Sequence, residues 1–289
     1  MKILLTVLAT LFACGGAVAQ SPANWTRPTT AFQVIDTIYY VGSEGLSAWA
    51  IKTPAGVILL DVGMPANAAA VEDSLRALGF RLGEVKILLN SHAHFDHAGG
   101  LAKLKADTGA ILVASAGDRP ALEHGVYPGW ESRRDFDFPP VKVDRVIGDG
   151  ESVVLGGVQL TAVLTPGHSA GCTSYSMTVH DKGVAHQVLF FCSASVAANR
   201  LAPDPQYPGI VQDYRRTFAK LKAIKADILL APHAEFFDLA ARRARLGAPT
   251  NPFIDPAALP KLTAAMEAEF NRQLAIQTKA AGQNVGARR

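Results

Sequence analysis

A short stretch near residue 90 constrains the fold of this chain more than any other. The run 85–90 is almost entirely apolar, as expected of a central strand covered on both faces. It leads directly into the sequence SHAHFDH at 91–97, which places three histidines and one carboxylate within six residues. Buried imidazole and carboxylate groups need polar partners, and one metal site satisfies several of them at once. The pattern therefore predicts a buried strand that ends at a metal site.

The spacing within this cluster indicates how its side chains are divided between two metal ions. His92 and His94 lie two positions apart, so an extended backbone projects both to the same side, which suits two imidazoles on one zinc ion. Asp96 and His97 fall in the following turn, where they are expected to bind a second metal ion nearby. A single histidine is more often an ordinary hydrogen-bonded residue, but four ligand-type side chains at this spacing favour metal binding.

Two isolated histidines later in the chain are candidates to complete the site. His168 follows an apolar run and the turn Thr-Pro-Gly, and His233 follows an apolar run and Ala-Pro. Turns at strand ends are where a β scaffold usually carries its functional groups. Asp61, at the end of the expected strand 56–62, is either a partner that orients a ligand histidine or a plain turn residue. The remaining histidines are expected on the surface or in loops: His124, His180 and His186.

The alternation of strand and helix patterns predicts an α/β (α+β) fold. The chain has 289 residues, of which 49% are hydrophobic and 18% charged, so a large core is expected. The expected strands are 35–41, 46–52, 56–62, 85–90, 111–114, 142–147, 152–155, 158–164, 173–179, 188–192 and 228–231. The expected helices are 66–78, 101–109, 119–124, 210–224, 237–246 and 260–278. No linker separates the two halves, so 20–289 is predicted to be a single domain with internal pseudo-duplication.

The loop 125–140 is irregular and carries several aromatic residues. Two interpretations remain open for it, because long loops in compact chains are either binding walls or packed Ω-loops without a function. The formal net charge is only +3 and no block of like charges occurs, which indicates neither nucleic-acid binding nor a polybasic membrane patch.

Residues 1–19 are predicted to be a signal peptide. Lys2 provides the positive start, 3–12 the apolar stretch, and Ala17-Val18-Ala19 the cleavage site. The apolar stretch is shorter than the ~20 residues that span a bilayer. Export to the periplasm is therefore expected, and no other segment is apolar and long enough to be transmembrane. The minor alternative is lipid attachment at Cys14, because residues 11–14 loosely resemble a lipoprotein box. Phe12 fits that box badly.

Removal of the signal peptide leaves Cys172 and Cys192 as the only cysteines. An even pair in an exported protein favours a disulfide, because the compartment is oxidising. Two buried free thiols are the other interpretation.

The motif at 92–97 resembles the HxHxDH signature of the metallo-β-lactamase superfamily, whose fold is a four-layer αββα sandwich. More narrowly, the chain resembles class B β-lactamases of the third subclass, in the segments 38–42, 139–144, 165–168 and 251–255. This resemblance implies two zinc ions. The first would be bound by His92, His94 and His168, and the second by Asp96, His97 and His233.

The segment 190–195 separates this subclass from its relatives. Most hydrolases of the superfamily have an aspartate there that bridges the two metals. The other β-lactamase subclasses have a cysteine ligand at that position. This chain has no carboxylate in the segment, and the resemblance aligns Ser193 with the ligand position. Cys172 and Cys192 then match a disulfide of some members. A one-residue slip of the alignment would instead make Cys192 a zinc ligand. Ser193 and Ser195 would bind the substrate carboxylate, although Ser195 has an equally good interpretation as a water-facing hydroxyl.

The resemblance implies a zinc-dependent β-lactamase, and hence antibiotic resistance. A zinc-bound hydroxide would open penicillins, cephalosporins and carbapenems, with Asp96 orienting the nucleophile. The expected partner is a small-molecule β-lactam and the expected state is a monomer. The alternatives are another exported hydrolase of the same fold, such as a lactonase, thioesterase or phosphodiesterase, and a non-catalytic zinc-binding module.

Overall fold

The computed structural model describes residues 21–129 and 134–286, and side-chain environments as far as 281. The predicted signal peptide, 1–19, lies outside the described residues. Within them, no helix combines the length and the apolar character needed to cross a membrane.

Two β-sheets form the centre of the molecule. The first half of the chain builds a seven-stranded sheet in the order β1 to β7. Its strands are β1 Phe32–Ile35, β2 Ile38–Tyr40, β3 Trp49–Thr53, β4 Gly56–Leu60, β5 Val85–Leu89, β6 Ile111–Ser115 and β7 Arg145–Ile147. Neighbours are antiparallel from β1 to β4 and parallel from β4 to β7.

The second half of the chain builds a five-stranded sheet in the order β12-β11-β10-β9-β8. Its strands are β8 Ser152–Leu155, β9 Val158–Leu164, β10 Thr173–Asp181, β11 Val184–Phe190 and β12 Ile228–Leu230. The pairs from β8 to β11 are antiparallel, and β12 joins β11 in parallel. Parallel pairing requires a crossover, and the helix between β11 and β12 provides it.

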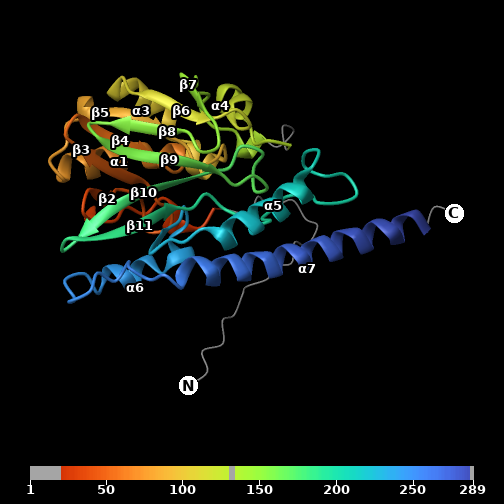
Figure 1. The fold of residues 1–289 in the computed structure, drawn as a ribbon. Coiled ribbons are helices and arrows are strands. Elements are labelled where there is room, and N and C mark those ends of the chain that lie inside the picture. Colours follow the sequence, from red (N-terminus) through yellow and green to blue (C-terminus); the bar gives the residue numbers. More distant parts are fainter. Residues whose placement is uncertain (1–20, 130–133, 287–289) are drawn as a thin grey trace.

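Helices cover the outer face of each sheet. They are α1 Ala68–Ala77, α2 Phe95–Ala98, α3 Leu101–Thr108, α4 Arg119–His124, α5 Ile210–Ala223, α6 Leu239–Arg243 and α7 Ala258–Gly286. Short 3₁₀ helices are η1 Ala23–Trp25, η2 Pro65–Asn67, η3 Leu82–Glu84, η4 Arg134–Phe136 and η5 Ala234–Phe237. Figure 1 shows α3 and α4 on one side of the stacked sheets and α5 and α7 on the other. Helix α1 packs in the same apolar core as α3. The predicted αββα sandwich is confirmed.

The buried side chains of β4 show why the sheets stack in this way. Ile58 and Leu60 point into the core between the sheets, whereas Val57 and Leu59 point into the core beneath α1 and α3. Successive residues of a strand face opposite sides, so a strand covered on both faces must be apolar throughout. The continuous apolar run at 56–60 is the consequence.

Three expected elements differ from the structure. The single strand expected at 35–41 is a hairpin of β1 and β2, which turns at Asp36 with a φ of 46°. Aspartate tolerates this left-handed conformation better than most residues. The helix expected at 237–246 is shorter: α6 begins at Leu239, because Asp238 also adopts a left-handed φ, of 53°, and Phe237 is the last residue of η5. The strand β11 begins at Val184 rather than at 188. The sequence pattern did not indicate its first residues, because they are exposed and lack apolar spacing.

We expect the contact of α7 with α5 to carry a large share of the stability of this layer. Phe270 of α7 is 1% exposed and its ring centroid lies 4.9 Å from that of Tyr214 and 5.6 Å from that of Phe218. Phe270→Ala should lower the free energy of unfolding by ~3–5 kcal/mol, measured by urea denaturation. Ile276→Ala, at a position 49% exposed on the same helix, should change it by less than about 0.5 kcal/mol. Equal effects of the two substitutions would contradict this packing.

Candidate metal centre

The loops that follow three strands meet at one edge of the sandwich. The segment after β5 carries His92 and His94, and His94, whose backbone is extended, is the N-cap of the short helix α2. Asp96 lies in the first turn of α2 and His97 in its last turn. His168 follows β9 and His233 follows β12. All six candidate ligands are therefore carried by strand ends or by the turn next to one.

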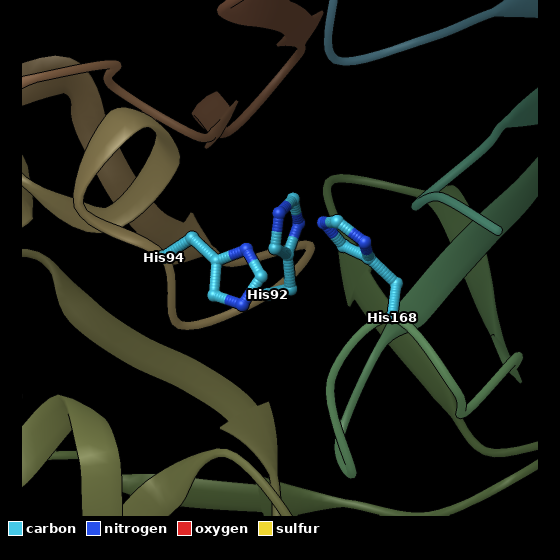
Figure 2. A group of neighbouring side chains, drawn as sticks. All are labelled: His92, His94 and His168. Atoms are coloured by element: carbon cyan, nitrogen blue, oxygen red, sulfur yellow. The ribbon is translucent and has the colours of Figure 1, made fainter. Parts of the chain in front are cut away.

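The six side chains form two groups of three. Within each group the potential ligand atoms all lie within 4.8 Å of one another: His92, His94 and His168 in the first, and Asp96, His97 and His233 in the second. In Figure 2 the three imidazoles of the first group point toward one another, with His168 approaching from the side opposite to the other two. The structure thus brings together the same two triads that the family resemblance implies.

The donor atoms of both groups fit a divalent metal ion. The buried Nε2 of His92 has no hydrogen-bond partner, which is costly for a polar atom unless something else binds it. In the second group Nε2 of His97 lies 3.2 Å from Nε2 of His233 and 3.3 Å from Oδ2 of Asp96. Histidine nitrogen and carboxylate oxygen are donors that zinc and neighbouring transition metals accept readily.

Burial and mutual repulsion keep most of these histidines neutral. Desolvation, followed by repulsion from neighbouring histidines, holds the pKa values of His92 and His94 well below the ordinary value. The pKa of His168 falls to about 4 and that of His233 to about 3, chiefly through desolvation. A metal ion binds the neutral imidazole, so these four side chains are in the ligand form at neutral pH.

Asp96 and His97 form a close ion pair. Burial acts to raise the pKa of Asp96, but a hydrogen bond with His97 and attraction to His97, His233 and His94 together outweigh it, so the carboxyl pKa is lowered overall. Desolvation acts to lower the pKa of His97, but a hydrogen bond with Asp96 and attraction to Asp96, Asp61 and Glu235 together raise it. A cation bound beside Asp96 would replace the proton on His97.

Asp61 supports the first group from behind. Its Oδ2 accepts a hydrogen bond from the hydroxyl of Ser91 at 2.6 Å, and that hydroxyl lies 2.9 Å from Nδ1 of His92. Its Oδ1 accepts from the backbone N–H of Ser91 at 2.8 Å and from the amide of Asn90 at 3.0 Å. Of the two interpretations of Asp61, the structure favours the one in which it orients a ligand histidine.

Asp118 is a second supporting carboxylate, and sequence reasoning missed it. It is 1% exposed and accepts hydrogen bonds from the backbone N–H of Ala93 at 3.0 Å, the hydroxyl of Ser169 at 2.9 Å and the N–H of Gly171 at 3.0 Å. Burial raises its pKa to about 6. Asp118 thereby ties the loop of His94 to the loop of His168. In the sequence it is an ordinary turn aspartate before α4, so no local signal marks it.

The second imidazole nitrogen of His168 is also held. Its Nδ1 donates to the backbone carbonyl of Ser195 at 2.8 Å, which leaves Nε2 free to face the other two histidines. Ser195 itself lines the groove beside the metal centre. Ser193 is 1% exposed and its hydroxyl accepts the N–H of Ser195 at 3.2 Å. Of the two candidate substrate-binding serines, only Ser195 faces the groove.

A groove of about 400 Å³ lies over the two groups and has largely aromatic walls. Tyr127 stacks on His94 with ring centroids 4.1 Å apart, and Phe136 stacks on Phe95 at 5.3 Å. The described part of loop 125–140 therefore contributes a wall, as one of its two interpretations predicted. Trp25 forms another wall 5.3 Å from His233, a contact that no sequence signal indicated. A larger hollow of about 740 Å³ adjoins the groove at Glu235 and contains no predicted site residue.

Cys172 and Cys192 are joined in a disulfide. Cys192 consequently belongs to neither group of ligand atoms, which agrees with the alignment that places Ser193, rather than this cysteine, at the ligand position.

The comparisons with known proteins agree with this geometry. Residues 44–233 match the family model of the metallo-β-lactamase superfamily, and the chain belongs to this superfamily. Within it, the structure resembles subclass B3 enzymes over most of the chain. It is 50% identical to BJP-1, a subclass B3 metallo-β-lactamase of Bradyrhizobium japonicum, covering 90% of this chain and 98% of that one with a TM-score of 0.88.

Three further relatives are less similar than BJP-1. The FEZ-1 metallo-β-lactamase from Legionella gormanii is 35% identical, with a TM-score of 0.84 and coverage of 87% and 98%. A hydroxyacylglutathione hydrolase of Methylococcus capsulatus is 30% identical over 62% of this chain, and the match spans 58% of that relative. The chicken acyl-coenzyme A thioesterase MBLAC2 is also 30% identical, over 53% of this chain and 58% of that relative. The family and the two donor groups together point to a divalent metal.

The disulfide leads to a prediction about stability. Under denaturing, non-reducing conditions the protein should show no thiol that an alkylating reagent can reach at Cys172 or Cys192. Reduction should lower the free energy of unfolding by about 3 kcal/mol, since the closed loop is short. In the control, the double variant Cys172→Ala/Cys192→Ala should show no response to reductant. Two alkylated cysteines before reduction would contradict the bond.

Proposed function

We propose that the protein is a zinc-dependent β-lactamase that hydrolyses the amide bond of penicillins, cephalosporins and carbapenems with two zinc ions. The observation that carries the proposal is the pair of triads in one groove, on a chain that is 50% identical over 90% of its length to a subclass B3 enzyme. The export signal 1–19, the single domain 20–289, a periplasmic location and a monomeric state are parts of the same proposal. The Cys172–Cys192 disulfide suits an oxidising compartment.

The two groups would hold one zinc ion each. His92, His94 and His168 would bind the first, and Asp96, His97 and His233 the second. Zinc at these residues would supply a water nucleophile at neutral pH, because it lowers the pKa of bound water to about 7, and would polarise the substrate carbonyl.

The protein residues would orient and shield the reaction. Asp96 is ionised at neutral pH and lines the groove, so its carboxylate can hold the attacking water and accept its proton. The Ser195 hydroxyl can donate to the carboxylate of the β-lactam. The rings of Trp25, Tyr127 and Phe136 would cover the apolar body of the substrate and limit access of bulk water.

A second candidate function is hydrolysis of another ester, thioester or lactone on the same fold. It is favoured by curated relatives such as the thioesterase MBLAC2 and the N-acyl homoserine lactonase AttM of Agrobacterium fabrum, which is 33% identical over 36% of this chain. These matches are shorter and less similar than those to BJP-1 and FEZ-1. The segment 190–195 also lacks a carboxylate that could bridge two metals.

An assay of the purified zinc-loaded protein separates the two functions. We expect ring opening of a penicillin, a cephalosporin and a carbapenem. The loss of ultraviolet absorbance of each substrate measures this reaction. The activity should disappear with a chelator and return with zinc, because the proposed nucleophile is a water that zinc activates. An acyl homoserine lactone and an acyl thioester, assayed under the same conditions, test the second candidate function. Chelator-sensitive turnover of these two, with none of the three β-lactams opened, would contradict the β-lactamase proposal.

Asp96→Ala tests the assignment of the second group. Loss of this ligand and proton acceptor should reduce kcat at least about 100-fold. Zinc content, measured by atomic emission, should fall toward one ion per chain. The control is Asp73→Ala, because the Asp73 side chain is 76% exposed on α1, does not line the groove and, among the described residues, pairs only with Arg76. Turnover and zinc content equal to the wild type would remove the role of Asp96.

A further inference from the structure

The groove has one wall whose backbone conformation needs outside support. This wall is the start of the segment 195–207, which we call the wall loop, and Ser195, Ala197 and Ala198 line the groove. Ala197 adopts a left-handed φ of 47°, a conformation that is unfavourable for a residue with a Cβ atom. Such a conformation persists only where surrounding contacts determine it. The question is which contacts do so.

A glutamine of the C-terminal helix binds this loop at three backbone positions. Oε1 of Gln277 accepts hydrogen bonds from the N–H groups of Leu201 at 2.6 Å and Ala202 at 3.4 Å. Its Nε2 donates to the carbonyl of Asn199 at 3.1 Å. One side chain therefore satisfies three backbone groups of an irregular segment, which has no strand or helix partner of its own. In Figure 1 the C-terminal part of α7 extends beyond α5 on the side of this loop.

The wall loop in turn contacts the opposite wall of the groove. Nη1 of Arg200 donates to the carbonyl of Gly129 at 3.3 Å, and Nε2 of Gln206 donates to that of Pro128 at 2.5 Å. Both carbonyls follow Tyr127, which stacks on His94. A continuous set of contacts thus runs from α7 through the wall loop to the aromatic wall.

Other contacts, which do not involve the Gln277 side chain, hold the metal ligands. Nδ2 of Asn199 donates to the carbonyl of His168 at 2.9 Å and to the hydroxyl of Tyr214 at 3.0 Å. Tyr214 donates to the carbonyl of Ser195 at 2.8 Å, the same carbonyl that His168 binds. These contacts lie between Gln277 and the first triad. Loss of the Gln277 side chain would release the outer part of the loop but leave His168 fixed.

We infer that Gln277 is a positioning residue that sets the shape of the groove and thereby the choice among β-lactams. The inference rests on the proposed function. Ala197 and Ala198 of the wall loop line the same groove as Tyr127. A substrate with a bulky side chain would therefore contact both walls and depend on their separation. A substrate with a small side chain contacts mainly the metal centre, so its turnover is less sensitive to the loop.

The experiment compares Gln277→Ala with Gln273→Ala in the full-length, zinc-loaded protein. Gln273 lies one turn earlier on α7, and within the described part of the chain its amide donates only to Glu269 of the same helix. Hydrogen exchange at Leu201 and Ala202 should accelerate about 5- to 10-fold in Gln277→Ala, because each amide loses its acceptor. In Gln273→Ala it should not change. Gln277→Glu keeps the acceptor oxygens and should restore most of the protection.

Steady-state kinetics and zinc affinity complete the test. For a cephalosporin with a bulky side chain, Gln277→Ala should raise KM about 5- to 10-fold and leave kcat within about 2-fold, while KM for a penicillin with a small side chain changes little. Zinc affinity should equal that of the wild type. Unchanged exchange at Leu201 and Ala202, an equal KM effect on both substrates, or a joint loss of kcat and zinc would each overturn the inference. A wild-type protein that opens no β-lactam would contradict the proposed function, and the exchange data would still decide whether Gln277 holds the loop.

Discussion

Two buried carboxylates, Asp61 and Asp118, hold the loops on which the rest of the site depends. Asp61 fixes the end of β5 through Ser91 and Asn90, and Asp118 joins the loop of His94 to that of His168. A buried carboxylate is unfavourable unless several hydrogen bonds satisfy it, and both receive three from the loops they hold. The same hydrogen bonds that make these charges tolerable therefore place the candidate ligands.

The stacking of the two sheets explains why the groove lies at this edge. The first sheet contributes His92, His94, Asp96 and His97 after β5, and the second contributes His168 and His233 after β9 and β12. Neither sheet could assemble a complete triad alone. Helices α5 and α7 cover the second sheet, and α7 continues far enough to bind the wall loop through Gln277. The outermost layer thus takes part in shaping a groove that the inner layers build.

Local patterns predicted most of the fold because each one has a direct physical cause. The apolar run before His92 indicated a strand covered on both faces, and α5 matched its apolar spacing almost to the residue. The errors arose where one residue adopts a left-handed conformation, at Asp36 and Asp238, since such a turn depends on backbone geometry rather than on apolar spacing. Trp25 and Asp118 could not be assigned from the sequence, because their partners lie far away in the chain and their own neighbours carry no pattern.

The sequence by itself determined the chemistry: three histidines and an aspartate in six positions, two later histidines, and a segment at 190–195 without a carboxylate. These features depend on residue type and spacing, which are local. Only the tertiary structure decided, on geometric grounds, that His168 joins the first triad and His233 the second. It also decided the burial of Ser193 behind Ser195 and the link between Gln277 and the wall loop. Such contacts join residues that only the stacking of the two sheets and their helices brings within hydrogen-bond distance.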